Sequence, residues 1–168
     1  MVKICYNILV KIFVRRGRKR TKFRRNFQMA IKMRILHTPG KKKLYNIASM
    51  IKAEYDLSIN SVDKIPPAYS CDKERIVILA LTGKGDVPDD LRLFCRELTK
   101  ARAANVALMI DGTPAYADQL KAILKEAGTN VIDEVLYVKL GLPFLASLTP
   151  EEKATILAWV QKVTESLQ

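Results

Sequence analysis

Six consecutive apolar residues run from position 76 to position 81, Ile76-Val77-Ile78-Leu79-Ala80-Leu81. A strand with one face in water alternates apolar and polar residues, whereas unbroken apolarity is typical of a strand that is covered on both faces. Such strands belong to parallel sheets, because the crossover connections of a parallel sheet place helices on its faces. The run therefore predicts a central strand of an α/β domain.

On both sides of this run, extended and helical patterns alternate. We expect further strands at 34–37, 57–62, 106–110 and 131–140, with 57–62 at an edge of the sheet. Apolar residues at helical spacing predict helices at 43–55, 88–98 and 116–127, and a last helix from 150 onward. Thr149, Pro150 and Glu152 form a helix-start signature, because Thr and Glu can complete a capping box around a proline in the first turn.

The order of these elements predicts the fold. Alternating strands and helices with short connections favour a parallel sheet with helices on both faces. We expect an α/β fold with a doubly wound, five-stranded parallel sheet in the order 2-1-3-4-5, arranged as a three-layer sandwich. One crossover helix is missing between the second and third strands, where Pro66 and Pro67 predict an extended linker.

Almost all of the net charge of +12 lies at one end of the chain. Residues 1–32 contain eleven of the 29 Lys and Arg residues and no acid, which leaves 18 bases and 17 acids in residues 33–168. We therefore divide the chain into a basic N-terminal extension, 1–32, and a near-neutral domain, 33–168. Two interpretations of the extension stay open: a start codon assigned too early, with Met29 or Met33 as the true start, or a basic tail for nucleic acid or anionic membrane.

Composition excludes several classes of function. No uninterrupted apolar run of about 18 residues exists, so a transmembrane segment is not expected. The three cysteines are far apart and suit a reducing cytoplasm, and the single histidine excludes a histidine-rich metal site. No catalytic constellation stands out, and the charge balance of 33–168 does not call for nucleic acid.

Three glycine-bearing loops follow strands that the sheet order places side by side. In doubly wound sheets, ligands bind outside the carboxyl ends of the strands, where the strand order reverses. The candidate binding residues are Thr38, Gly40, Lys41, Lys42 and Lys43 in the first loop, Thr82, Gly83, Lys84 and Gly85 in the second, and Asp111, Gly112, Thr113 and Tyr116 in the third.

The first loop has the strongest indication of an anion site. It opens a helix, where free backbone amides and the helix dipole favour a negative group, and three lysines add positive charge. Glycines that only form turns and lysines that are only solvated remain the alternative interpretation of the same residues.

From Met33 onward, the chain resembles the flavodoxin family. The resemblance rests on the order of strands and helices, on the run 76–81 with its loop, on Val87-Pro88 and the helix that ends in Arg96-Glu97-Leu98, and on the stretch from Val106 to the final helix. It implies a flavin mononucleotide (FMN) site in the three loops. Two interpretations of Tyr116 stay open: a ring that stacks on the flavin, and a core residue early in a helix. It also implies a role in electron transfer with a redox partner protein, as a carrier rather than a catalyst.

The chain departs from the flavodoxin pattern at the phosphate loop. Flavodoxins carry S/T-x-T-G-x-T there, but when the chain is aligned on Gly40 the three hydroxyl positions hold His37, Pro39 and Lys42. The second loop also has no aromatic residue. Two functions therefore stay open: an FMN-binding electron carrier, and a flavodoxin-fold binding or interaction module that has lost the flavin.

Overall fold

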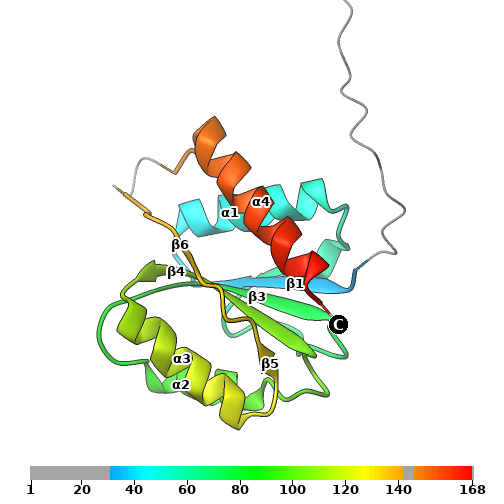
Figure 1. Cartoon of the computed structure of the whole chain (residues 1–168), viewed down its shortest axis with the longest axis vertical. Helices are drawn as coiled ribbons and strands as arrows, with labels where there is room; N and C mark the ends of the chain where they lie inside the picture. The colour runs from blue at the N-terminus through cyan, green and yellow to red at the C-terminus, as the bar shows by residue number, and fades with distance from the viewer. Residues whose placement is uncertain (1–30, 142–145, 168) are drawn as a thin grey trace, which may run out of the picture.

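The computed structural model describes residues 31–141 and 146–167 of the chain (Figure 1). Its strands are β1 (Met33–His37), β2 (Val62–Lys64), β3 (Ile76–Gly83), β4 (Asn105–Gly112), β5 (Asn130–Val131) and β6 (Leu136–Tyr137). Its helices are α1 (Lys42–Glu54), α2 (Asp89–Glu97), α3 (Pro114–Glu126) and α4 (Pro150–Glu165), together with the single 3-10 turn η1 (Ile59–Ser61).

The strands form one parallel sheet in the order β2-β1-β3-β4-β5, and β6 also pairs with β4. This confirms the α/β fold class and the doubly wound order predicted from the sequence. Along the central pair, β3 and β4 stay in register from Val77 beside Val106 to Gly83 beside Gly112. The carboxyl ends of the two strands therefore lie level with each other.

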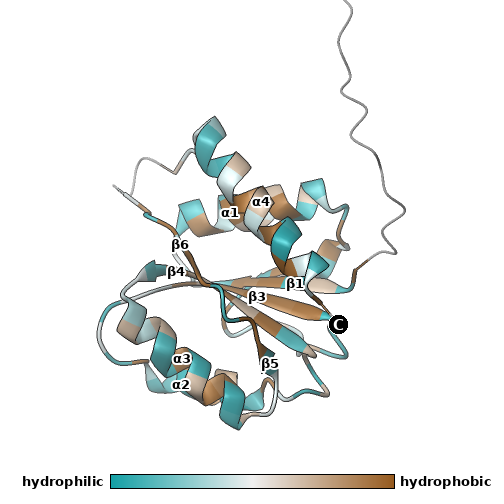
Figure 2. Cartoon of the chain, in the orientation of Figure 1, coloured by the Kyte–Doolittle hydropathy of each residue, from teal (hydrophilic) through white to brown (hydrophobic). Residues whose placement is uncertain are grey.

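Helices cover both faces of the sheet, which gives the three layers (Figure 1). Helices α1 and α4 pack on one face, and α2 and α3 on the other. Figure 2 shows strands that are apolar along most of their length and helices that are apolar on the side facing the sheet. This distribution matches the amphipathic spacing from which the helices were predicted.

Strand β3 joins the two halves of the core. Val77, Leu79 and Leu81 belong to the cluster under α2 and α3, whereas Ile76, Ile78 and Ala80 belong to the cluster under α1 and α4. All six side chains are buried. Burial of each large aliphatic side chain contributes about 1.5–3 kcal/mol, so the central strand is a rigid support for the loops at its end.

Strand β2 lies later in the chain than the sequence pattern predicts. We expected a strand at 57–62, but the structure has η1 at Ile59–Ser61 and the strand at Val62–Lys64. The reason is a local turn, in which the backbone amide and the hydroxyl of Ser61 both donate to the carbonyl of Ser58, at 3.1 and 2.7 Å. Ile59, which the alternating pattern placed in the strand, is 84% exposed.

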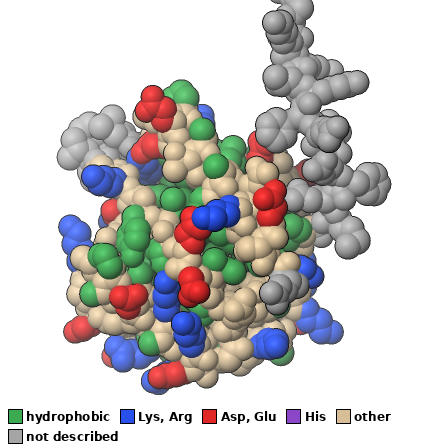
Figure 3. Space-filling model, in the orientation of Figure 1, with side chains coloured by type: hydrophobic (Ala, Val, Ile, Leu, Met, Phe, Trp, Pro, Cys, Tyr) green, Lys and Arg blue, Asp and Glu red, His purple; other side chains and the backbone are tan. Residues whose placement is uncertain are grey.

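The predicted strand at 131–140 is split into two short pieces. β5 pairs Val131 with Val106, and β6 pairs Leu136 with Met109, so two extra residues bulge out between them. The carbonyl of Asp133 accepts from Lys121 at 2.7 Å, and Glu134 forms an ion pair with Lys162. These bonds hold the charged residues away from the ladder, while hydrophobic side chains gather at the surface around β6 (Figure 3).

The last two residues of the predicted extension contact the domain. Ile31 packs against the core under α1 and α4, and the carbonyl of Lys32 accepts from the amide of Arg75 at 2.8 Å. Residues 1–30, which carry the rest of the extension, lie outside the described residues. Among the helices that the structure describes, none has the length and apolar composition needed to cross a membrane.

Candidate functional site

The three glycine-bearing segments meet at the carboxyl edge of the sheet, as the strand order predicts. β1, β3 and β4 are neighbours, and Thr82 of β3 lies beside Asp111 of β4. Thr82 and Gly83 are the last residues of β3, and Asp111 and Gly112 are the last of β4. All the candidate residues therefore lie at or just beyond these three strand ends.

Hydrogen bonds connect these ends directly. The hydroxyl of Thr38 accepts from the amide of Thr82 at 3.2 Å, and the Thr82 hydroxyl donates to Asp111 Oδ2 at 3.2 Å. The amide of Thr38 also donates to the carbonyl of Ala80 at 3.0 Å. Two of the hydroxyl groups that were candidates for ligand binding thus hold the loops to one another.

The start of α1 carries free positive charge. Gly40 has φ +74°, a conformation that suits glycine, with open space where a side chain would be. Helix α1 has no side-chain cap and no acid in its first turn. The backbone N–H groups of its first residues therefore have no acceptor within the helix. Lys41 and Lys42 are exposed beside them.

Lys43 is not part of this free charge. Its ammonium group lies 2.7 Å from Glu152 Oε1 and 3.0 Å from the carbonyl of Lys139, and its side chain is only 12% exposed. Lys43 therefore fastens the start of α1 to α4, and the positive charge at the first loop comes from two lysines rather than three.

The partner of Lys43 has a perturbed acidity. The hydrogen bond from Lys43, assisted by the amide of Thr149 in the capping box of α4, lowers the pKa of Glu152 below its ordinary value. A carboxylate with a lowered folded-state pKa stabilises the fold above its unfolded pKa, which is about 4.5, and loses that contribution as pH falls through the folded value.

Glu152→Gln is expected to lower the free energy of unfolding at pH 7 by about 0.5–1 kcal/mol, because it removes a half-exposed ion pair and weakens the capping box. The difference from wild type should be smaller at pH 3 than at pH 7, because the stabilising contribution of ionised Glu152 is lost as pH falls below about 4.5 through the folded pKa. Urea unfolding at the two pH values measures it. Glu126→Gln, at the end of α3, is the matched control, and an equal loss in both variants at pH 7 would contradict the role of Lys43.

Tyr116 lies in the core rather than in the site. The amide of Tyr116 donates to the cap residue Thr113 at 3.3 Å, and the side chain is 1% exposed. Its ring fills the space next to Gly83, where an added Cβ would lie 2.3 Å from ring atom Cζ. The expectation that this ring stacks on a ligand does not fit that placement.

A different aromatic residue is exposed at this edge. Tyr45, in the first turns of α1, is 52% exposed, and its ring meets that of His37 edge to face at 5.7 Å. The sequence does indicate that this aromatic side chain is exposed, because Tyr45 falls outside the apolar stripe of the helix, which consists of Leu44, Ile47, Ala48 and Ile51. His37 and Tyr45 place an accessible ring close to the first loop.

The remaining loop residues are open to solvent. Lys84 is exposed, and Gly85 is in the left-handed region at φ +93° with open space around it. Two hollows in the described part of the molecule, of about 410 and 330 Å³, lie at the opposite, amino edge of the sheet. At the carboxyl edge, the exposed side chains include those of Lys41, Lys42, Tyr45 and Lys84.

Two further observations bound the chemistry of the site. Within residues 31–141 and 146–167, no three His, Cys, Asp or Glu side chains lie together as metal ligands. Comparison with models of known protein families and with curated proteins finds no significant match to this chain, so the site's own geometry carries the functional conclusion.

Proposed function

We propose that the chain binds a phosphorylated ligand at the carboxyl edge of its sheet, that this ligand is FMN, and that the protein takes part in electron transfer. The observation that carries the proposal is the start of α1: uncapped amides, no acid in the first turn, positive-φ Gly40, and the exposed lysines 41 and 42. Amides, helix dipole and ammonium groups all favour a phosphate there.

The fit of the residues to FMN differs between its two ends. The phosphate end is supported by Lys41, Lys42 and the α1 amides. For the ring, the exposed side chain of Tyr45 offers a flat apolar contact beside His37. Bound FMN would supply the redox chemistry, and the protein would position the cofactor and set its electrostatic surroundings.

A second candidate is a flavodoxin-fold interaction module without a flavin. It is favoured by the burial of Tyr116, which leaves this ring unable to stack on a flavin, and by the hydrogen bonds that hold Thr38 and Thr82 to neighbouring strands. In this function the same lysines bind an anionic group of a partner.

The test is a titration of the purified protein with FMN, riboflavin and inorganic phosphate, read by flavin fluorescence and by calorimetry. Lys41→Ala/Lys42→Ala is expected to weaken FMN binding about tenfold, because each exposed charge near a helix start contributes about 0.3–1 kcal/mol. Lys100→Ala/Lys125→Ala removes the same charge from the exposed amino edge and should leave the affinity unchanged.

The outcomes separate the two candidates. Saturable binding of FMN, weaker for riboflavin, supports the electron carrier. Phosphate binding without flavin binding supports the interaction module. No binding of any of the three, or equal losses in the two lysine variants, contradicts an anion site at the start of α1.

A further inference from the structure

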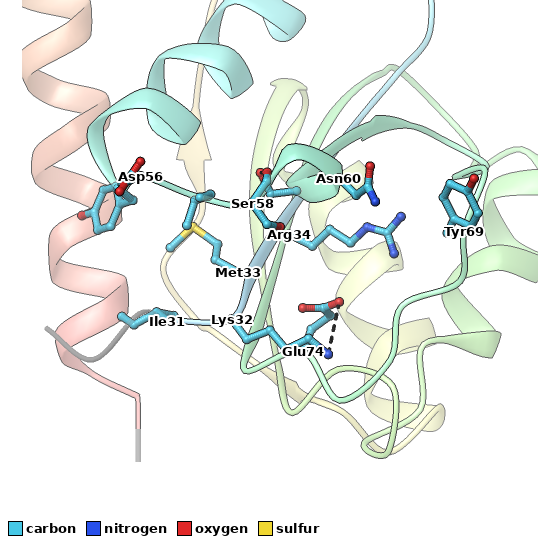
Figure 4. Close-up of a pocket in the computed structure, with 12 residues that line it drawn as sticks. Ile31, Lys32, Met33, Arg34, Asp56, Ser58, Asn60, Tyr69 and Glu74 are labelled. Carbon is cyan, nitrogen blue, oxygen red and sulfur yellow. Dashed lines mark hydrogen bonds and ion pairs between the residues drawn. The ribbon is translucent and has the colours of Figure 1, made fainter.

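The larger hollow lies at the amino edge of the sheet, beside the start of β1 and the turn that follows α1 (Figure 4). It has a volume of about 410 Å³, which is the size of a small-molecule site. The polar and charged side chains that matter here are those of Arg34, Asp56, Ser58, Asn60, Tyr69 and Glu74.

Arg34 is the unusual member of this lining. It is 5% exposed, and its Nη1 donates to the carbonyl of Ser70 at 2.9 Å. Its Nε and Nη2 are buried and have no hydrogen-bond partner among the described residues. The nearest ion-pair partner, Asp63 Oδ2, is 3.9 Å from Nη2, which is too far for a hydrogen bond.

The two unpartnered nitrogens form one edge of the guanidinium group. That edge presents two parallel N–H donors, the fork that binds a carboxylate at both of its oxygens. Asp63 does not close this fork, because its nearest oxygen lies 3.9 Å from Nη2, while its two oxygens accept from the amides of Lys64 and Ala68 at 2.8 and 2.7 Å. Leaving a buried charged donor unpaired is costly, so the position favours an added carboxylate.

The other charged side chains in the lining indicate which further groups the ligand carries. Lys32 donates to the carbonyl of Asp72 and forms an ion pair with Glu74 at 3.9 Å, so Arg34 is the cation of this lining that keeps buried N–H groups without a hydrogen-bond partner. Asp56, which is exposed and has no ion-pair partner among the described residues, brings a carboxylate to the same lining. A dianionic phosphate would be repelled by Asp56, whereas a ligand with one carboxylate and one ammonium group meets opposite charges at both ends.

We propose that this hollow binds a small amphoteric molecule, with its carboxylate on the Nε–Nη2 edge of Arg34 and its ammonium group toward Asp56. Ser58 and Asn60 add a hydroxyl group and an amide group to the lining. Tyr69, which is 69% exposed, lies at the end of the hollow toward which the Arg34 guanidinium points (Figure 4), and it is free to turn aside as the carboxylate enters.

The experiment is an NMR titration of the whole protein that follows the Nε–Hε signal of Arg34, assigned with the variant Arg34→Lys. The probes are 4-aminobutyrate, butyrate, 4-aminobutanamide and inorganic phosphate. We expect a saturable shift with 4-aminobutyrate, at least about fivefold weaker binding of butyrate, and no saturable shift with the amide, since each charged contact contributes about 1 kcal/mol. The Nε–Hε signal of exposed Arg96 should not move.

Where Arg34→Lys does not fold, the Arg34 signal is assigned in the wild type through the carbons of its own side chain, so the titration still decides the proposal. An unmoved Arg34 signal at about 50 mM 4-aminobutyrate, equal effects of butyrate and the amide, or tighter binding of phosphate would each overturn it. Addition of FMN is expected to leave the Arg34 signal in place, because the proposed FMN site is at the carboxyl edge of the sheet and Arg34 is at the opposite, amino edge. Failure of this site and failure of the FMN site are therefore separate results.

Discussion

Gly112→Ala is expected to lower the free energy of unfolding by about 3 kcal/mol, the largest loss for a single added methyl group in this domain. A Cβ at position 112 would lie 2.1 Å from the backbone carbonyl oxygen of Gly83 and 3.1 Å from Cγ2 of Ile110. Gly83 and Gly112 are partners in the β3–β4 ladder, so the clash cannot be relieved without moving one central strand. Urea unfolding monitored by circular dichroism measures the loss.

The matched control is Gly128→Ala, after α3. Gly128 has φ +83° with open space around it, so alanine there meets only the backbone strain of the left-handed region, about 1 kcal/mol. A loss at Gly112 no larger than the loss at Gly128 would contradict the close approach of the two strand ends.

Tyr116→Ala is expected to lower the free energy of unfolding by about 3–5 kcal/mol, because it removes a fully buried aromatic ring that packs on β3. Tyr116→Phe keeps the ring and should cost much less. If the ring were a ligand platform instead, the alanine variant would lose affinity for the ligand while keeping its stability. Thermal unfolding together with the FMN titration distinguishes these results.

A double variant tests the same contact from the other side. In the wild type, Gly83→Ala places a methyl group against the Tyr116 ring, so it is expected to be destabilising. In the Tyr116→Ala background the ring is absent and the methyl group enters its space, so the same substitution should cost less. Additive losses in the two backgrounds would show that the residues do not touch.

The fold was predictable because its signals are local. The unbroken apolar run 76–81 and the helical spacing of residues such as Leu120 and Leu124 each specify an element without reference to the rest of the chain. The strands at 57–62 and 131–140 were misplaced in part. Their bounds depend on a Ser58–Ser61 turn and on bonds from Lys121 and Lys162, which a pattern of hydrophobicity does not contain.

The site was predictable in its location but not in its details. Topology alone brings the ends of β1, β3 and β4 together. The role of each side chain depends on partners that are distant in sequence. Lys43 donates to Glu152 and to the carbonyl of Lys139, so it is not free to bind an anion. Tyr116 packs against Gly83 in the core. The Arg34 hollow had no sequence signal, because a single arginine at the start of a strand has no distinctive pattern.

The split of the fifth strand has a consequence for association between molecules. A long, regular edge strand exposes a row of free backbone groups that another chain can extend into a larger sheet or a fibril. Here the β5–β6 edge consists of two two-residue pieces separated by residues 132–135, which include Asp133 and Glu134, and the opposite edge, β2, is three residues long and ends in Lys64. Both edges are therefore too short to offer another chain a continuous row of free backbone groups, although hydrophobic side chains lie at the surface around β6.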